Sequence, residues 1–389
     1  MRNIPLSVPN LKSGNERKYV LEAIDAEWVS TGGQYINDFE KALANYLKTD
    51  KVVACQSGTA AIHVALMLAG VKMEDEVIVP TLTFIAAVNP VTYVKAHPVF
   101  MDVDETLCMD LNKLENFLTN QTEMCDGVCV NKKTGRSIKA LVMVHVYGNM
   151  TDMAKLMEIC NRHNIKVIED ATEALGSYIT EGALKGKHAG TIGHFAALSF
   201  NGNKIITTGG GGAVVARKIE DLEKATYLTT QAKNDALYYL HDEVGYNYRM
   251  TNLQAALGLA QLEQLDEFIS LKYNNFTYYK NKIDAIDGLE ILPFSKTIKP
   301  NYWFYTLLVK ENFSINRDEL QKRLSEKGIQ TRPVWGLIHK QKPYLQCETY
   351  EINKALEYYD QILNIPCSSN LTKDDIDYIV ESIKEIAEL

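Results

Sequence analysis

The sequence lacks a long apolar run, a surplus of positive charge and a recognisable leader. Its longest apolar stretches, such as Ala140 to Val146, have the length of a strand and fall far short of the ~20 residues that cross a bilayer. Met1 to Asn10 has no apolar core of the kind that marks a signal peptide. The net charge of −8 provides no basic field for nucleic acid or an anionic membrane. We therefore expect no nucleic-acid partner and no membrane association.

The cysteines show no regular spacing. Seven of them, an odd number, fit reduced thiols, and we expect a cytoplasmic protein. Cys125 and Cys129 could supply half of a zinc site, but no second pair of thiols follows to complete a tetrahedral set. The sequence therefore predicts no metal. No GxGxxG motif follows an early strand, which disfavours a nicotinamide-dependent oxidoreductase.

The first half of the chain has an alternating pattern. From about residue 36 to residue 216, helix-like stretches alternate with short apolar runs that predict strands at 51–55, 76–80, 98–103, 139–146, 166–170 and 212–216. This alternation is typical of an α/β fold, with a mostly parallel sheet between two layers of helices. Ligands of such sheets bind beyond the carboxyl ends of the strands. The residues directly after each run are therefore the candidates for chemistry.

The pattern changes at about residue 251. The rest of the chain predicts a long helical stretch at 251–285, in one piece or broken in two, a strand at 303–309 and helices at 316–327 and 372–388. A loop rich in polar and aromatic residues is expected before the last helix. With 389 residues the chain is long enough for two domains. We predict a large domain at 1–250, which begins with an N-terminal arm at 1–30, and a smaller α+β domain at 251–389. The segment 119–136 shows no clear period, so we expect an exposed loop there.

A candidate phosphate site follows the first predicted strand. Gln56-Ser57-Gly58-Thr59 lies between strand 51–55 and an apolar helix. Glycine and small hydroxyl residues at a helix N-terminus expose backbone N–H groups and the positive end of the helix dipole, which together bind phosphate. The same residues could also form a plain N-cap with a tight turn.

Two ionisable residues lie at other strand ends. Asp170 ends the strand KVIED, where its carboxylate could pair with a protonated ring nitrogen or could simply cap a helix. Lys204 lies between apolar residues in SFNGNKIITT, ahead of four glycines. Partial burial lowers the pKa of a lysine and favours the neutral amine that Schiff-base chemistry requires. A lysine that extends to solvent at the sheet edge is the alternative.

An aromatic residue completes the set. Phe84 follows strand 76–80 and could stack on a flat cofactor ring, although most phenylalanines simply pack in a core. A phosphate grip, a stacking ring, a carboxylate for a ring nitrogen and an imine-forming lysine are the parts of a pyridoxal-phosphate (PLP) site. Their joint occurrence at strand ends predicts a PLP enzyme.

The sequence resembles the DegT/StrS family of sugar aminotransferases over nearly its whole length. The stretches that carry the resemblance are WVSTGGQYINDFEKALANYL (28–47), CQSGTAAIHVAL (55–66), VIVPTLTFIAAVNPV (77–91), VIEDATEALGS (167–177), SFNGNKIITTGGGG (199–212), GYNYRMTNLQAALGLAQL (245–262) and TRPVWGLIHKQ (331–341). The resemblance implies the aspartate-aminotransferase-like fold type I: a large α/β/α domain with a mostly parallel sheet, followed by a smaller C-terminal α+β domain.

The resemblance also implies roles for individual residues around the cofactor. Lys204 would form the Schiff base with PLP and then carry protons. Asp170 would hold the pyridine nitrogen, and Phe84 would cover the face of the ring. Glu173 stands where many relatives have histidine or glutamine, so its contact near the ring departs from the family pattern.

The phosphate and the substrates would be held by further residues. The resemblance assigns the cofactor phosphate to Gly58, Thr59 and Ser199, and it implies that Asn247 reaches the phosphate site of a neighbouring subunit, so that a homodimer shares its active sites. Arg332 and His339 are candidates for contacts with the sugar or the pyrophosphate, although both residue types are common in surface loops. The substrates would be a nucleotide sugar and L-glutamate.

The implied reaction is the amination of a nucleotide-linked 4-keto-6-deoxy sugar. The motifs are similar to those of enzymes of legionaminic acid and bacillosamine pathways, which act on 2-acetamido sugars linked to UDP or GDP in the biosynthesis of surface polysaccharides. A sugar 3-aminotransferase, an inosose aminotransferase and a non-catalytic regulatory protein of the same fold remain open. A PLP-dependent sugar dehydratase is disfavoured, because relatives with that activity have histidine at the position of Lys204.

Overall fold

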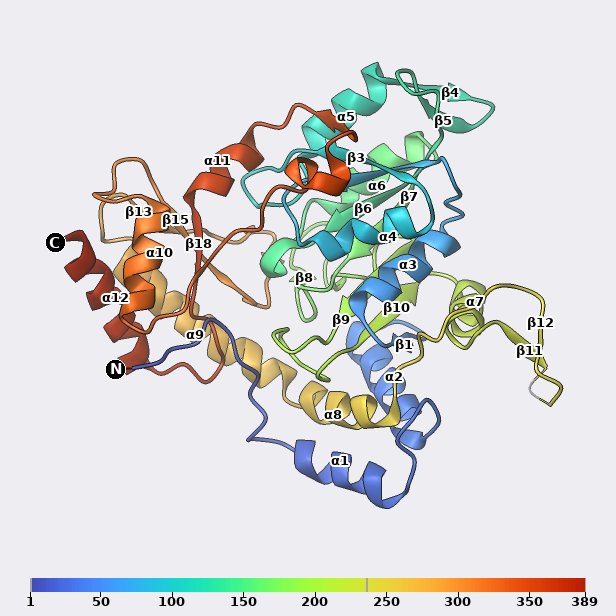
Figure 1. Ribbon diagram of the computed structural model, residues 1–389, viewed down its shortest axis with the longest axis horizontal. Coiled ribbons are helices and arrows are strands. Elements are labelled where there is room, and N and C mark those ends of the chain that lie inside the picture. Colours follow the sequence, from blue (N-terminus) through green and yellow to red (C-terminus); the bar gives the residue numbers. More distant parts are fainter. Residues whose placement is uncertain (1, 236, 389) are drawn as a thin grey trace.

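The computed structural model describes residues 2–235 and 237–388 (Figure 1). The helices are α1 (Glu16–Asp25), α2 (Gln34–Leu47), α3 (Gly58–Leu68), α4 (Asn89–Tyr93), α5 (Leu111–Asn120), α6 (Met153–Arg162), α7 (Ile219–Thr229), α8 (Asn252–Leu262), α9 (Leu265–Ile283), α10 (Arg317–Glu326), α11 (Lys354–Gln361) and α12 (Lys373–Ala387). The strands are β1 (Val53–Cys55), β2 (Glu76–Pro80), β3 (His97–Met101), β4 (Thr122–Cys125), β5 (Val128–Asn131), β6 (Ile138–Val144), β7 (Lys166–Asp170), β8 (Tyr178–Ile179), β9 (Phe195–Ser199), β10 (Gly212–Ala216), β11 (Lys233–Asp235), β12 (Leu240–His241), β13 (Leu289–Ile291), β14 (Ile298–Lys299), β15 (Tyr305–Val309), β16 (Arg332–Pro333), β17 (Glu348–Tyr350) and β18 (Ile362–Ile365).

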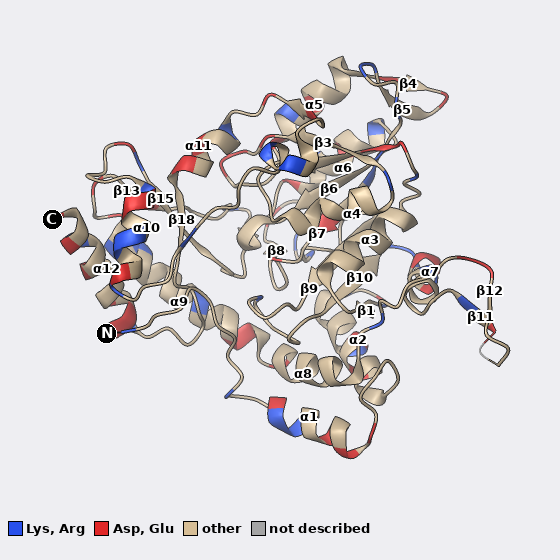
Figure 2. Cartoon of the chain, in the orientation of Figure 1, with Lys and Arg blue, Asp and Glu red and all other residues tan. Residues whose placement is uncertain are grey.

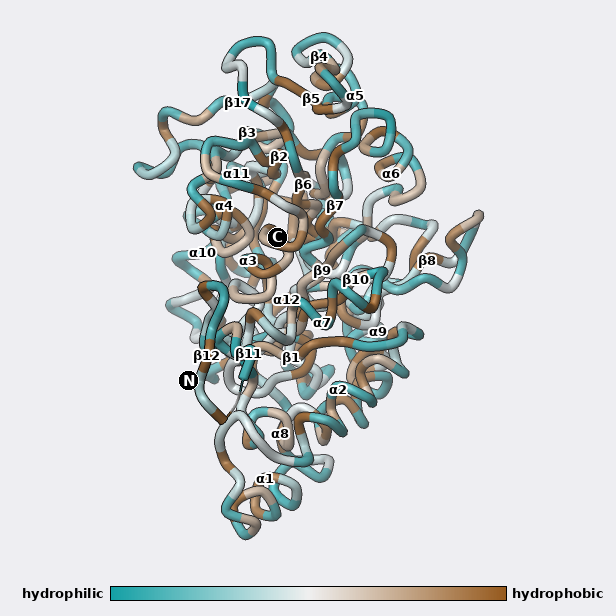
Figure 3. The backbone as a smooth tube through the Cα atoms, turned by 90° about the vertical axis from the view of Figure 1, so that its right-hand side faces the viewer, coloured by the Kyte–Doolittle hydropathy of each residue, from teal (hydrophilic) through white to brown (hydrophobic). Residues whose placement is uncertain are grey.

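A mostly parallel sheet forms the centre of the molecule. Its eight strands have the order β1-β10-β9-β7-β6-β2-β3-β17, and β10 is the strand that runs against its neighbours β1 and β9. The central strands are buried along their length, as expected for a sheet covered on both faces. In Figure 3 the strands lie between α3 and α4 on one side and α6 on the other, and the apolar residues concentrate along them. The predicted α/β fold is confirmed.

A second sheet follows in the C-terminal part of the chain. Strands β13, β15, β18 and β16 pair antiparallel in that order, and helices α9, α10 and α12 lie around them. The long predicted helix at 251–285 is two helices, α8 and α9, as the possible break implied. The segment expected to be a polar and aromatic loop contains helix α11 and strands β17 and β18. Strand β17 pairs with β3 and so extends the central sheet.

The segment 119–136 is ordered as a hairpin, which corrects the expectation of a loop. Strands β4 and β5 pair antiparallel across Asp126 and Gly127, both of which have positive φ angles, 49° and 78°. An Asp-Gly pair at a two-residue turn is the sequence signature of this geometry. Three of the four β4 residues are exposed, so this strand lacks the apolar alternation that marks a half-buried strand.

Charged residues lie mainly on the outer helices and hairpins, whereas the central strands carry few of them (Figure 2). The described part of the chain has no helix with the length and apolar character needed to cross a bilayer. All seven cysteines are free, and five of them are buried. Among residues 2–235 and 237–388, no group of three or more His, Cys, Asp or Glu side chains is arranged to hold a metal.

Candidate active site

A cavity of about 540 Å³ opens at the carboxyl ends of the parallel strands. Strand β7 ends at Asp170 and β9 ends at Ser199, and both residues line the cavity. Of the residues expected to act in a site, the cavity brings together Gly58, Thr59, Phe84, Asp170, Glu173, Ser199, Lys204 and Arg332. The rule that ligands bind beyond the strand ends therefore located this cavity from sequence.

The N-terminus of α3 forms one wall. Ser57 caps the helix by accepting a hydrogen bond from the backbone N–H of Ala60 at 3.1 Å, so the first N–H groups of the helix face the cavity beside Gly58 and Thr59. A Cβ atom on Gly58 would lie 2.9 Å from the Ser199 Cβ and 2.9 Å from the Thr172 side chain. Glycine at this position thus lets Ser199 and Thr172 pack closely against the helix N-terminus, whose N–H groups can bind an anion.

We expect Gly58→Ala to weaken cofactor binding selectively. The new methyl group must displace Ser199 or Thr172, and it narrows the cradle at the helix N-terminus. The apparent Kd for PLP, measured by titration of the cofactor absorbance, should rise at least about tenfold, as for the loss of one charge-assisted hydrogen bond. Gly32→Ala is the control for glycine replacement, because Gly32 does not have a positive φ and a new Cβ there would meet only the exposed ring of Trp28. Unchanged affinity in Gly58→Ala would contradict the assignment.

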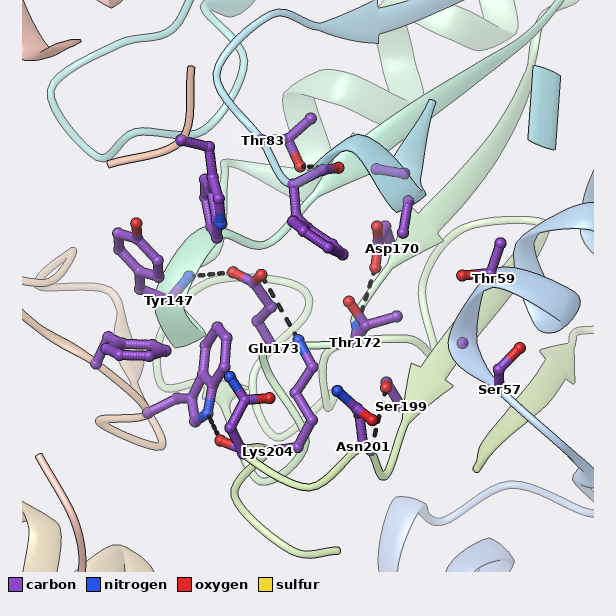
Figure 4. A pocket seen from close by; sticks show the side chains of 18 of the residues that line it. Ser57, Thr59, Thr83, Tyr147, Asp170, Thr172, Glu173, Ser199, Asn201 and Lys204 are labelled. Carbon is purple, nitrogen blue, oxygen red and sulfur yellow. Dashed lines mark hydrogen bonds and ion pairs between the residues drawn. The ribbon is translucent and has the colours of Figure 1, made fainter. Parts of the chain in front are cut away.

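Lys204 is held inside the cavity by two neighbours. Its Nζ lies 3.7 Å from the Glu173 Oε1, the ion pair drawn as a dashed line in Figure 4. The same Nζ lies 4.1 Å from the centre of the Trp303 ring. Trp303 is fixed in turn, because its Nε1 donates to the Asn203 carbonyl at 2.7 Å. Burial lowers the pKa of Lys204, while Glu173 and Asp170 partly restore it. A buried amine with a lowered pKa is the form that acts as a nucleophile and proton carrier.

Glu173 is held between Lys204 and a backbone amide. The Tyr147 N–H donates to its Oε2 at 2.9 Å (Figure 4), and Tyr147 itself has a positive φ of 56°. Burial raises the pKa of Glu173 to about 7, and the charge of Lys204 acts in the opposite direction. Glu173 can therefore gain or lose a proton near neutral pH, directly beside the Lys204 amine.

The raised pKa makes Glu173 a source of pH-dependent stability. Its pKa is about 7 in the folded chain against 4.5 for an unperturbed glutamate, so the folded state holds the extra proton, and stability falls as pH rises through this window. Glu173→Gln keeps an acceptor for the Tyr147 amide but cannot ionise. From about pH 4.5 to about pH 8, the free energy of unfolding of the cofactor-free wild type should therefore fall by about 3 kcal/mol relative to that of cofactor-free Glu173→Gln. Urea unfolding at both pH values measures this fall, and a constant difference would contradict it.

Asp170 is a buried carboxylate with few local partners. It is 3% exposed, and the Thr172 backbone N–H donates to its Oδ1 at 3.1 Å. Burial raises its pKa, while Thr172, Lys204 and His145 lower it. A buried carboxylate is stable in its charged form when a cation lies next to it. A protonated pyridine nitrogen is such a cation.

Aromatic side chains form the wall opposite α3. The Tyr147 and Trp335 rings lie 4.8 Å apart, and the Trp335 and Phe84 rings 6.5 Å apart. Phe84 is 51% exposed, so its ring is not part of the core. Arg332 lies at the same wall, and its guanidinium donates to the Thr331 carbonyl. The wall combines flat apolar faces with one cation.

Two expected residues lie elsewhere. Asn247 accepts a hydrogen bond from the Gln231 Nε2 at 3.1 Å and does not line the cavity of its own chain. His339 contacts the Thr81 hydroxyl at 2.6 Å through its Nδ1 and also lies outside the lining. The roles predicted for them stay predictions.

The structure adds residues that sequence reasoning missed. Tyr147, Trp303, Phe304 and Asn364 line the cavity. Tyr147 could have been found, because it comes directly after the predicted strand 139–146, where ligands of such a sheet bind. The other three come from the C-terminal part of the chain, and nothing in their local sequence shows that this part folds against the strand ends.

The donor set fits PLP. The N-terminus of α3 at Gly58 can bind the phosphate. The buried Asp170 carboxylate can accept a hydrogen bond from a protonated ring nitrogen, and the buried Lys204 amine can form the imine. These three groups line one cavity.

Comparison with known proteins agrees with this chemistry. The profile of the DegT/DnrJ/EryC1/StrS aminotransferase family matches residues 11–384. The chain is 38% identical to the GDP-perosamine synthase of Caulobacter vibrioides over 98% of both sequences. It is also 38% identical to the GDP-perosamine synthase of Escherichia coli O157:H7 over 99% of both. Among solved structures, Helicobacter pylori PseC, an aminotransferase involved in the biosynthesis of pseudoaminic acid, has a TM-score of 0.88 at 24% identity and covers 100% of each chain, which shows the shared fold.

The cavity and the family match lead to the same assignment. The implied fold type I is confirmed by the similarity to solved aminotransferases. The chain belongs to the DegT/DnrJ/EryC1/StrS aminotransferase family and is a PLP-dependent sugar aminotransferase.

Proposed function

We propose that this chain transfers the amino group of L-glutamate to the C4 keto group of a GDP-linked 4-keto-6-deoxy sugar. The observation that carries the proposal is the position of Lys204, whose amine lies beside the ionisable Glu173 in the same cavity as Asp170. The choice of GDP is supported by the two relatives at 38% identity that are named GDP-perosamine synthase. Amination at C4 is supported by a relative at 30% identity named dTDP-4-amino-4,6-dideoxy-D-glucose transaminase.

In this proposal each residue of the cavity has one task. PLP supplies an electron-withdrawing ring that stabilises negative charge on the carbon next to the transferred nitrogen. The Lys204 Nζ takes a proton from that carbon in one half of the reaction and returns one in the other half. Asp170 keeps the ring nitrogen protonated, and Glu173 exchanges a proton with the Lys204 amine across 3.7 Å.

The aromatic wall supports binding of the sugar nucleotide. Trp335 and Phe84 offer ring faces to the sugar and the base, and both reach the cavity. Arg332 would hold the pyrophosphate, because its guanidinium is exposed at the rim and its one hydrogen bond within the described chain is to a carbonyl. His339 would position this wall, since the neighbouring Ile338 N–H donates to the carbonyl of Thr81, whose hydroxyl His339 contacts.

We also propose a homodimer with shared active sites in the cytoplasm, where reduced cysteines are stable. The hairpin β11–β12 projects from the body (Figure 1) and carries exposed apolar side chains, among them Leu237 at 76% and Tyr239 at 70%. Such a surface favours burial against a second copy. Asn247 lies at the base of this hairpin, where it could reach the neighbouring phosphate site.

The dimer leads to a specific expectation. Sedimentation equilibrium should give twice the chain mass, and Asn247→Ala should raise the Kd for PLP while it leaves the dimer intact. Asn45→Ala, at an exposed position of α2, is the control. A monomer with full PLP affinity would contradict the shared site.

The function itself is tested with a substrate panel. PLP-loaded protein is incubated with L-glutamate and, separately, with 4-keto-6-deoxy sugars linked to GDP, with 2-acetamido-4-keto sugars linked to UDP, with dTDP-linked 3-keto sugars and with an inosose. Mass spectrometry of the products should show an amino sugar for the GDP arm. A product in another arm alone would overturn the substrate assignment. No loss of the amino group from glutamate in any arm would favour the non-catalytic alternative.

A further inference from the structure

A second cavity lies at the other end of strands β9 and β10. Its volume is about 190 Å³, and its lining comes from the turn after α2, the loop that leads into β9 and the end of β10. Ser199 lines the active-site cavity, whereas Phe195, at the start of the same strand, lines this one. The two cavities are thus separated by the length of a five-residue strand, about 15 Å.

Positive charge dominates the lining. The lining contains three cationic side chains, those of Lys48, Lys187 and Arg217, and one carboxylate, that of Asp50. None of the three cations forms an ion pair with any residue that the structure describes. In a chain with a net charge of −8, a cavity with more cations than carboxylates is a local exception. It attracts anions, even though the chain as a whole repels them.

His194 adds a neutral donor to the lining. Its Nδ1 accepts from the Val167 backbone N–H at 3.1 Å, so the neutral ring carries its hydrogen on Nε2. Burial lowers the pKa of His194 to about 4, and the positive charges of Lys166, Arg217 and Lys218 contribute in the same direction. At neutral pH the ring is therefore uncharged and can donate a hydrogen bond to an anion.

The loop that leads into β9 forms one wall of this cavity, and hydrogen bonds to the buried Glu169 hold it in place. The backbone N–H groups of Gly190, Ile192 and Gly193 donate to the buried Glu169 carboxylate, which also contacts the His145 Nε2 at 2.8 Å. Both carboxylate oxygens of Glu169 accept hydrogen bonds in these contacts, so its negative charge is stabilised by the loop and by His145. A wall held in this way loses little conformational freedom when a ligand binds.

We propose that this second cavity binds a small phosphate-type oxyanion through Lys48, Lys187 and Arg217. The volume exceeds the ~30 Å³ of a water molecule and lies below the ~300 Å³ at which pockets for drug-sized ligands begin. Lysine and arginine together form charge-assisted hydrogen bonds with phosphoryl oxygens. The hydroxyl of Thr49 and the His194 ring provide neutral contacts at the same cavity.

The test uses PLP-saturated protein, in which the phosphate site beside Gly58 is filled. Calorimetric titration with pyrophosphate at constant ionic strength should show saturable binding. Lys187→Met/Arg217→Met should weaken it about tenfold or more, as expected for the loss of hydrogen bonds to a charged group. Lys72→Met/Lys95→Met, which removes two exposed charges elsewhere, should bind as the wild type does. Arg217→Lys should retain most of the affinity.

The outcomes separate clearly. The absence of saturable heat into the millimolar range would overturn the proposal, and so would equal binding by the two double variants, which would place the anion elsewhere. A parallel titration with GDP identifies the source of the phosphoryl group. GDP also enters the active site in our proposal, so only the part of its binding that is lost in Lys187→Met/Arg217→Met is assigned to the second cavity and indicates a nucleotide. A loss of pyrophosphate binding with unchanged GDP binding indicates the free anion. An unchanged cofactor absorbance in the variant shows that its active site is intact.

Discussion

Lys204→Ala should abolish transamination, with a fall in the rate of the glutamate half-reaction of about 10²- to 10⁴-fold or more. The substitution removes the amine that lies 3.7 Å from Glu173, and the other groups that line the cavity can bind the substrate but cannot carry its proton. The absorbance band of lysine-bound PLP should also be absent. Single-turnover spectrophotometry with glutamate measures both effects.

Two controls distinguish chemistry from folding in this experiment. Lys185→Ala, in an exposed loop, should leave rate and absorbance unchanged. A small primary amine added to Lys204→Ala should restore part of the rate, because it can accept the proton in place of the missing side chain. A variant that turns over at the wild-type rate would show that another base acts at this carbon.

Asp170→Asn should lower the rate of the same half-reaction by about 10- to 100-fold, which corresponds to the loss of one charged hydrogen bond of about 1.5–3 kcal/mol. Asparagine keeps the size of the side chain and an acceptor for the Thr172 amide, but it cannot stabilise a proton on the ring nitrogen. The loss should fall on kcat more than on KM, because Asp170 touches the cofactor and not the sugar in our proposal.

Stability provides an independent readout for Asp170→Asn. Burial raises the pKa of Asp170, so the ionised carboxylate costs free energy in the cofactor-free protein. The cofactor-free variant should therefore melt at the same temperature as the wild type or higher, whereas a structural role alone would lower the melting temperature. Asp25→Asn, at the exposed end of α1, is the matched control and should change neither quantity. An unaltered rate with Asp170→Asn would remove this residue from the site.

Much of the central sheet could be predicted from sequence because buried parallel strands are continuous apolar runs. The run KVIED predicted β7 and placed Asp170 at its end, whereas β9, the strand that precedes Lys204, was not among the predicted runs. The hairpin β4–β5 was missed because three of the four β4 residues are exposed, which removes the apolar alternation that marks a strand. The Asp126-Gly127 pair was the remaining signal.

The aromatic wall could not be predicted, and the reason is distance along the chain. Trp303 contacts Lys204, 99 positions away, and Trp335 contacts Tyr147, 188 positions away. A local pattern gives no information on such pairs. The acceptors of Lys272 illustrate the same limit: it is buried and donates to the carbonyls of Trp303 and Cys367, although its position in an amphipathic helix would suit a surface residue.

The pairing of β17 with β3 has a consequence for biosynthesis. A strand at residues 348–350 completes the sheet edge at β3, and the carboxylate of Asp102 binds the backbone N–H groups of Asn353, Lys354 and Ala355 at the start of α11. While the ribosome is still making the last part of the chain, β3 is therefore an open edge with unpaired backbone groups, which favours pairing with other nascent chains. Contacts of such long range also slow folding. The chain should consequently depend on chaperones until its C-terminal part has been released.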